Sequence, residues 1–366
     1  MLQIIADADL KDFIELPFTL YKGNSFFIPE LKSDTRHLLE KDPFWQNAKR
    51  RLFLALRDKK PVGRIAAIIN KTHNDYWKDN IGFFGFFECE DSQETANALI
   101  DAAKLWLKEQ GFSVLRGPVN PSTNHTCGVL LDNFDKPPVI MMPYNPPYYN
   151  ALLEGGGLKK AKDLVAFERT DKNDFSPRME RIMERILKNP EIKIRQINLA
   201  DFDNEVQIVR RIYNASWAQN WGFVPISEDE IKQTAKQLKM IVKKELTSVI
   251  EINGEPAGFA ISIPDMNHVL KIFRGTLGPI KILRALWAWK NIKDCRTIML
   301  GVLPEHRKRG LDLLLVKEIV EKGVKRGWNK AELSWLLEDN QSIISLVEEA
   351  GCYKTKTYRI YQEDIN

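Results

Sequence analysis

The stretch Thr297–Asp312 reads Thr-Ile-Met-Leu-Gly-Val-Leu-Pro-Glu-His-Arg-Lys-Arg-Gly-Leu-Asp, and the expected fold depends on it. Its first half is a short apolar run that stops at Pro304, which is typical of a buried strand. A basic turn closed by Gly310 follows. From Leu311 apolar residues recur at helical spacing, and Gly327 marks the end of that helix. The stretch therefore predicts a strand, a basic glycine turn and a helix.

This turn suits a phosphate group. The first N–H groups of a helix have no partner inside the helix and carry partial positive charge. Gly310 would let the backbone come close to an anion. The side chains of Arg307, Lys308 and Arg309 add positive charge at the same place.

The pattern Val302-x-Pro304-x-x-Arg307-x-x-Gly310 resembles the acetyl-CoA motif of the GNAT superfamily of N-acyltransferases. The resemblance implies that the turn binds the pyrophosphate of acetyl-CoA or a longer acyl-CoA, and that the strand pairs with the pantetheine arm. Asp312 departs from the family pattern, which usually has Gly or Ala there. The ordinary alternative is a strand, turn and helix with a solvated basic loop. The cofactor residues implied are Leu300, Gly301, Val302, Arg307, Lys308, Arg309, Gly310, Leu311, Asp312 and Asn340.

Composition limits the remaining possibilities. The chain has 366 residues, 44% of them hydrophobic and 28% charged, which is typical of a globular protein. A net charge of +5 suits an anionic cofactor or membrane surface and does not by itself indicate nucleic acid. The four cysteines form no CxxC pair and the five histidines show no metal spacing. Without a signal peptide or a membrane-spanning run, we expect a cytoplasmic protein, with peripheral contact at the inner face of the membrane as an alternative.

The chain also contains an internal repeat. Val62 and Ala257 each stand between Pro and Gly, and Asn145 and Asn340 each precede a Gly by eleven residues, so both pairs differ by 195 positions. Two copies of one unit are expected, each an α/β domain with a mixed central sheet flanked by helices. The resemblance agrees with tandem GNAT-like domains at residues 1–170 and 171–366, joined by the polar Asp171–Asp174.

Only the second copy is expected to bind CoA. The first copy follows its central strand with Glu90-Asp91 and has no glycine turn, and carboxylates there would repel a pyrophosphate. The first copy would then shape the acceptor side.

The implied reaction is attack by an amine on an acyl thioester. A protonated amine cannot attack, so a base must first remove its proton. Glu332, in a predicted strand beside the cofactor strand, is the candidate base, with a solvated carboxylate as the ordinary alternative. The acid position of the family pattern holds Val347, and Tyr353 is a nearby candidate that does not match it. Backbone N–H groups near Gly301 and Val302 could stabilise an oxyanion.

Two groups of residues are candidates for acceptor binding. In the second copy they are Trp217 and Trp221, which could equally be core residues. In the first copy they are Asn124, His125, Asn145, Tyr148 and Tyr149. An alternative for the first copy is a Cys127 thiol nucleophile with His125 as its base, although no oxyanion motif accompanies them.

Residues 267–293 form an insertion that contains six basic residues and no acidic one. After Pro279 its apolar residues, Trp287 among them, fall on one half of a helical wheel. Such a helix suits an anionic membrane surface, or else packs its Trp face on the domain. The first interpretation implies a lipidic acceptor, and with it the chain resembles the GNAT-like bacterial ceramide synthases.

The sequence thus predicts an acyl-CoA-dependent N-acyltransferase that acts on a small-molecule or lipid amine. A non-catalytic member that binds acyl-CoA or a membrane is the alternative, favoured by Asp312 and Val347.

Overall fold

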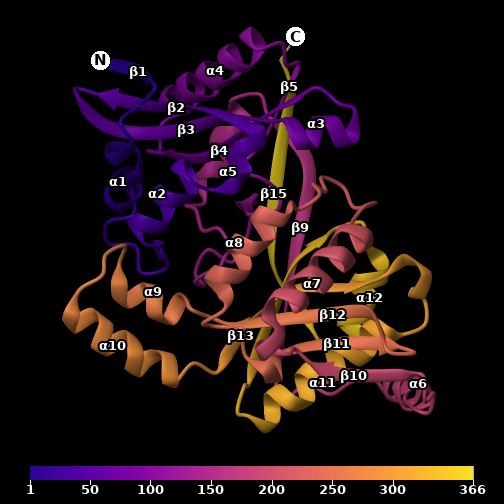
Figure 1. Ribbon diagram of the computed structural model, residues 1–366. Helices are drawn as coiled ribbons and strands as arrows, with labels where there is room; N and C mark the ends of the chain where they lie inside the picture. Colours follow the sequence, from indigo (N-terminus) through magenta and orange to yellow (C-terminus); the bar gives the residue numbers. More distant parts are fainter. Residues whose placement is uncertain (366) are drawn as a thin grey trace. The chain divides into compact units, whose positions relative to one another are not determined.

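The computed structural model describes residues 1–365 and divides into two compact units (Figure 1). Unit 1 comprises Met1–Leu164, Asn267–Lys290 and residues from Lys356 onward. Unit 2 comprises Val165–Met266 and Asn291–Thr355. The units therefore differ from a single division near residues 171–174, because the inserted helices and most of the last strand pack on elements of the first copy.

The sheet of unit 1 runs β1 (Leu2–Ala6), β2 (Ala48–Arg57), β3 (Lys60–Asn70), β4 (Ile81–Cys89), β5 (Val114–Gly117) and β15 (Tyr353–Asp364). Only β4 and β5 are parallel neighbours in this order. Strands β2 and β3 form a hairpin, and Asp58 and Lys59 both have positive φ, as a two-residue turn of this kind requires. Short strands β6 (Val119–Asn120), β7 (Thr126–Cys127) and β8 (Val129–Leu130) follow β5.

Helices cover both faces of this sheet. They are α1 (Leu10–Leu20), α2 (Lys32–Glu40), α3 (Lys71–Trp77), α4 (Gln93–Glu109), α5 (Tyr148–Gly155), α9 (Asn267–Phe273), α10 (Pro279–Lys290) and the 3-10 turn η1 (Pro43–Asn47). Helix α4 buries an apolar face, with Leu99 and Ile100 fully enclosed. Its N-cap is Ser92, whose Oγ accepts from Thr95 N–H.

The sheet of unit 2 runs β9 (Lys159–Thr170, from Val165 onward in this unit), β14 (Lys330–Leu337), β13 (Asp294–Val302), β12 (Glu255–Pro264), β11 (Thr247–Ile252) and β10 (Ile192–Gln196). Its helices are α6 (Pro177–Leu187), α7 (Phe202–Ser216), α8 (Glu228–Leu238), α11 (Leu311–Lys325) and α12 (Gln341–Glu349), with 3-10 turns η2 (Leu199–Asp201), η3 (Lys244–Leu246) and η4 (Pro304–His306). The predicted strand, turn and helix are therefore β13, η4 with its following loop, and α11.

The internal repeat is confirmed in three dimensions. In unit 1, β3, β4, α4 and β5 follow one another as β12, β13, α11 and β14 do in unit 2. Each set has an antiparallel pair followed by a parallel pair. The matched residues Val62 and Ala257 even make the same contact, since their carbonyl oxygens accept from Glu90 N–H and Leu303 N–H at 2.9 Å.

The insertion forms the hairpin of α9 and α10 in unit 1. Asn267 Nδ2 donates to Pro138 O at 2.7 Å, and Lys32 N–H donates to Gly275 O at 2.9 Å. These contacts hold α9 and the connecting turn. Helix α10 instead exposes its apolar side chains, Leu283 by 70% and Trp287 by 73%. Packing of the Trp face on the domain is therefore wrong for Trp287.

Candidate functional site

The end of β13 has an open edge in unit 2. Strand β13 pairs with β14 only from Asp294 to Thr297, whereas its pairing with β12 continues to Val302. Among the described residues, β14 thus accompanies only the first half of β13. An exposed strand edge can pair with an extended chain that carries amide groups.

A β-bulge explains why the strands separate. Ile261 of β12 opposes Met299, and the next residue, Ser262, opposes Thr297, so Ile298 is an extra residue in β13. A bulge of this kind bends its strand and increases the local twist. The bulge lies where the pairing with β14 ends.

The pairing with β12 also decides which backbone groups face the edge. Because Leu303 N–H donates to Ala257 O, the alternation along the strand turns Gly301 toward β12 and turns Leu300 and Val302 toward the edge. Val302 O accepts from Ser216 Oγ at 2.9 Å. Of the two amides expected at the oxyanion position, only that of Val302 faces the edge.

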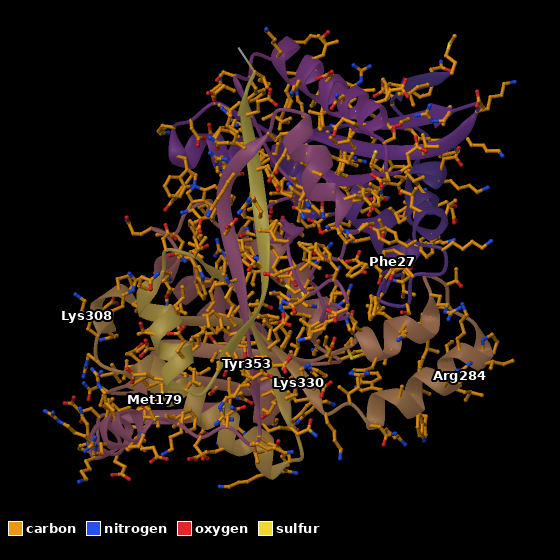
Figure 2. All side chains as sticks on the ribbon, turned by 180° about the vertical axis from the view of Figure 1, so that it is seen from behind. Phe27, Met179, Arg284, Lys308, Lys330 and Tyr353 are labelled. Carbon is orange, nitrogen blue, oxygen red and sulfur yellow. The ribbon has the colours of Figure 1, made fainter. Side chains whose placement is uncertain are left out.

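The basic turn leads directly from this edge to α11. Gly310 has a φ of +72° and is the N-cap of α11, a conformation that glycine adopts without the usual steric cost. Arg307 Nη2 donates to Ser216 O at 2.5 Å, which ties the turn to the end of α7. Arg307, Lys308 and Arg309 are all exposed, and Figure 2 shows Lys308 in this turn. The turn therefore offers a helix N-terminus surrounded by cations.

Asp312 places a carboxylate at the same helix start. Its Oδ1 accepts from Leu313 N–H at 3.0 Å, so the side chain uses a donor that a phosphate could bind. Burial raises the pKa of this carboxyl, while hydrogen bonds from the backbone oppose the shift. The backbone geometry thus fits an anion, and Asp312 competes with it.

Trp217 lies against the cofactor strand. A Cβ added to Gly301 would lie 2.6 Å from the Trp217 ring, so only glycine leaves room for it. Trp217 also stacks on Tyr213, with ring centroids 4.7 Å apart. Trp221 is half-buried in the loop that follows α7. The structure therefore brings Trp217 beside the open edge.

Glu332 and Tyr353 lie elsewhere in unit 2. Glu332 is buried in β14 opposite Arg296, within the closed part of the β13–β14 pair. Tyr353 Oη donates to Glu168 Oε1 at 2.6 Å, and this hydrogen bond raises the pKa of Tyr353 to about 12. Asn340 is the N-cap of α12, where its side chain accepts from Ile343 N–H. The catalytic roles of Glu332 and Tyr353 stay predictions.

The matching edge in unit 1 is closed by the chain itself. Cys89 N–H donates to Tyr149 Oη, and Tyr148 Oη donates to Cys89 O, both at 2.9 Å. Asn120 Oδ1 accepts from Phe86 N–H at 2.5 Å. At the start of α4, Glu90 and Glu94 pair with Arg57 at 3.1 and 2.9 Å. The first copy therefore lacks both the open edge and the basic turn.

The other acceptor candidates of unit 1 hold loops in place. His125 Nδ1 lies 2.9 Å from Ser122 Oγ, which also accepts from Asn124 N–H. Asn145 Oδ1 accepts from Leu130 N–H at 2.7 Å. Cys127 is buried.

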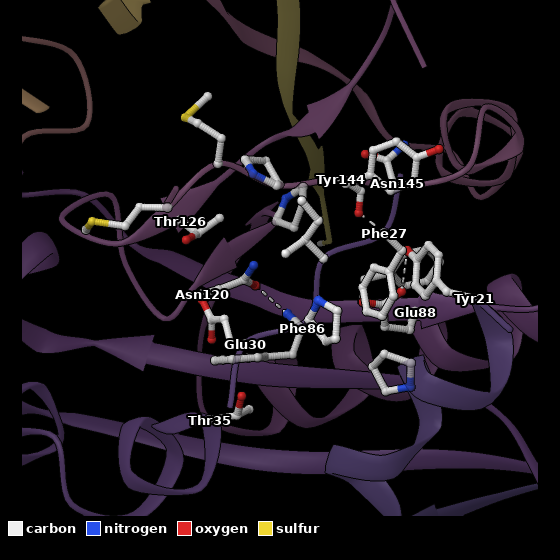
Figure 3. Close-up of a pocket in the computed structure, with 18 of the residues that line it drawn as sticks. Tyr21, Phe27, Glu30, Thr35, Phe86, Glu88, Asn120, Thr126, Tyr144 and Asn145 are labelled. Carbon is white, nitrogen blue, oxygen red and sulfur yellow. Dashed lines mark hydrogen bonds between the residues drawn. The ribbon is translucent and has the colours of Figure 1, made fainter. Parts of the chain in front are cut away.

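Unit 1 contains a cavity of about 220 Å³ (Figure 3). Asn145 and Tyr149 line it, whereas Asn124, His125 and Tyr148 do not. The polar residues of the lining that sequence reasoning missed include Tyr21, Glu30, Arg64 and Glu88. Glu88 had a readable signal, because it is a single charge inside the apolar run of β4. The others had none, since they come from distant segments.

No group of three or more His, Cys, Asp or Glu residues within positions 1–365 could hold a metal ion. Over the same positions no helix has both the length and the hydropathy that crossing a bilayer requires.

Sequence comparison finds two relatives of almost the same length. Protein YghO of Escherichia coli (strain K12) is 34% identical over an alignment of 366 positions, which covers 98% of this chain and 93% of that protein. The bacterial ceramide synthase of Caulobacter vibrioides (strain NA1000 / CB15N) is 34% identical over an alignment of 365 positions, which covers 97% of this chain and 95% of that protein. No family model matches the chain.

Solved structures show the same fold at low identity. A tandem GNAT protein from the clavulanic acid biosynthesis pathway superposes with a TM-score of 0.58 at 11% identity, covering 100% of this chain and 99% of that one. A GCN5-related N-acetyltransferase from Sphaerobacter thermophilus superposes with a TM-score of 0.53 at 11% identity, covering 99% of this chain and 96% of that one.

Proposed function

This chain belongs to the tandem GNAT-fold acyltransferases, with YghO and the bacterial ceramide synthase as relatives, and from that premise we propose that it is an acyl-CoA-dependent N-acyltransferase. One observation carries the proposal. The open edge of β13 runs directly into a basic turn whose Gly310 begins α11. A strand edge that can bind amide groups is followed directly by a helix start that can bind an anion. This arrangement suits an acyl donor that has an amide arm and a pyrophosphate.

The backbone of β13 and α11 indicates which residues would bind each part of the acyl donor. Leu300 and Val302 would pair with the amide arm of the acyl donor as an added strand does. Lys308, Arg309 and the first amides of α11 would hold its phosphates. In the reaction, the deprotonated amine attacks the thioester carbonyl, the C–S bond breaks, and CoA leaves as a thiol after it gains a proton.

We further infer that the acceptor is a long-chain amine, met at an anionic membrane surface. Two observations support this choice. A relative that matches over nearly its whole length is named a bacterial ceramide synthase. In this chain, α10 exposes apolar side chains, and residues 267–293 contain no acidic residue. Basic helices with exposed apolar side chains bind anionic interfaces.

A release assay for free CoA tests the function. Purified protein would receive acetyl-CoA or palmitoyl-CoA together with a short amine or a long-chain amine presented in vesicles. We expect CoA release only when an amine is present, and the fastest release with the long-chain amine. If CoA binds but no amine causes release, the chain is a non-catalytic acyl-CoA binder, the role that Asp312 favours.

A further inference from the structure

We propose that a small apolar cavity in unit 2 receives the acyl chain of the donor and sets the chain length that the protein prefers. This inference rests on the proposed function, since it concerns the donor of the same reaction. The cavity has a volume of about 50 Å³ and lies among α7, α8, β12 and β13, so we refer to it as the α7–α8 cavity. All the residues that line it belong to unit 2.

The walls of the α7–α8 cavity consist mostly of apolar side chains. Examples from its helices and strands are Val206, Val209, Leu238, Ile261, Ile298 and Met299. Glu205 is an ionisable residue of the lining, but only 2% of its surface is exposed, and Arg195 Nη1 donates to its Oε1 at 2.6 Å. The ion pair balances the charge of this carboxylate. An apolar cavity offers water few hydrogen bonds, whereas an alkyl group fills it favourably.

The cavity exists because α8 is attached to α7 rather than to the sheet. A hydrophobic cluster separate from the main core joins the two helices, and its members are Phe202, Val206, Tyr213, Ile226, Ile231 and Ala235. Among the described residues, no strand contributes to this cluster. Space is thus left between the end of α8 and the strands, where Leu238 and Val242 form part of the lining.

The bulge in β13 turns two consecutive side chains toward this cavity. In a regular strand the side chains of Ile298 and Met299 would lie on opposite faces of the sheet. Both line the α7–α8 cavity, because the extra residue at the bulge breaks the alternation. Leu300, the next residue, packs instead against the core cluster that contains Leu311 and Leu314 of α11. The cavity therefore borders β13 at the bulge itself.

The bulge is also the place that the reactive end of the donor would reach. With its phosphates at the helix start near Gly310, the donor would extend its amide arm along the open edge from Val302 toward Ile298. This part of the strand spans roughly 13 Å at the usual rise per residue. The edge ends at Thr297, where pairing with β14 begins. The thioester would thus lie beside the bulge, and the acyl chain beyond it would enter the cavity.

The volume of the cavity indicates how much of the chain it can hold. A space of about 50 Å³ has room for roughly four groups of the size of a water molecule or a methylene. Each methylene that moves from water into such a space raises the affinity about fourfold. The single methyl group of an acetyl donor would leave most of the space empty. The cavity therefore favours a donor whose chain extends several carbons beyond the thioester.

Titration of the whole protein with CoA, acetyl-CoA and octanoyl-CoA tests the inference, with calorimetry as the readout. We expect octanoyl-CoA to bind about tenfold or more tighter than acetyl-CoA, because its added methylenes fill the cavity. Equal affinities for the two acyl donors would overturn this inference, while binding of CoA would leave the proposed function intact. If none of the three ligands binds, the proposed function itself fails, and this inference fails with it.

Two matched variants test whether the acyl chain lies in this cavity. Val242→Phe fills the space, so it should abolish the preference for octanoyl-CoA over acetyl-CoA and leave the affinity for CoA unchanged. Val324→Phe is the control, because Val324 is 43% exposed and lines a separate cavity of about 40 Å³ in unit 2. This variant should keep the preference of the wild-type protein. An unchanged preference in Val242→Phe contradicts the inference.

A third variant covers the case in which thermal unfolding shows that Val242→Phe does not fold. Leu238→Ala enlarges the cavity instead of filling it. It should shift the preference toward a longer chain, so that decanoyl-CoA gains affinity relative to octanoyl-CoA. A chain-length preference identical to that of the wild-type protein would place the acyl chain outside the α7–α8 cavity.

Discussion

Asp312 is the residue that sets the strength of the proposed phosphate site. Its carboxylate accepts from Leu313 N–H, at the helix start where an anion would bind. Because burial raises the pKa of this carboxyl, the folded protein holds its proton more tightly than the unfolded chain does. Lowering the pH toward the raised pKa should therefore remove the competing charge.

Asp312→Asn should tighten CoA binding. The amide oxygen can still accept from Leu313 N–H, but the negative charge beside the phosphates is gone. A change of about 1 kcal/mol, roughly fivefold in affinity, is expected for one like charge at partial burial. Calorimetric titration at neutral pH measures it. If the Asp312→Asn variant and the wild-type protein bind CoA with equal affinity, Asp312 does not face the phosphates.

Arg307→Ala should weaken CoA binding by about 1.5–3 kcal/mol, the value of a charge-assisted contact. Part of this loss would come from the turn itself, because Arg307 also donates to Ser216 O. Arg326→Ala is the matched control, since it removes the same charge from the exposed far end of α11. Equal affinities for both variants in the titration would exclude the turn as the phosphate site.

Among the elements, those with a local signal were predictable from the sequence. The apolar run and Pro304 predicted β13, Gly310 predicted the turn, and Pro279 predicted the start of α10. Two features were not predictable. The bulge at Ile298 depends on pairing with β12, and the exposure of α10 depends on what the rest of the fold leaves uncovered. An amphipathic pattern is the same for a packed face and an exposed one.

Leu283→Glu should abolish binding to anionic vesicles at low salt. The change puts a negative charge on the exposed apolar side chains of α10, where Leu283 is 70% exposed. Met240→Glu is the control, because Met240 is similarly exposed, at 75%, but belongs to unit 2. Cosedimentation measures the effect. Wild type that stays in the supernatant, or forms dimers through α10 in gel filtration, would contradict the membrane interpretation.

For the whole molecule, the tandem repeat was predictable because short matched motifs recur at one offset, as with Val62 and Ala257. The cavity residues Glu30, Arg64 and Glu88 were not, since they meet only after the chain folds. The composition of the units was not predictable either. Pairing of β15 with β5 and β8 assigns residues from Lys356 onward to unit 1, which no local pattern near Lys356 indicates.

We expect one CoA per chain. In unit 1 the edge that matches β13 is closed by Tyr148, Tyr149 and Asn120, and the carboxylates at the start of α4 pair with Arg57. A second pyrophosphate would have to displace these contacts. Calorimetric titration measures the number of CoA molecules bound per chain. Two equivalent sites would mean that the closed strand edge of unit 1 opens in solution.

Strand β15 has a consequence for how the protein is made. Unit 2 ends at Thr355, whereas the sheet of unit 1 needs residues that follow Lys356. On the ribosome, which adds about 5–20 residues per second, domains ordinarily fold in the order of synthesis. Here all residues of unit 2 are synthesised before unit 1 is complete, because the last strand of unit 1 is made at the end. During translation the chain thus carries an unfinished sheet edge at β5, which is the kind of surface that chaperones bind.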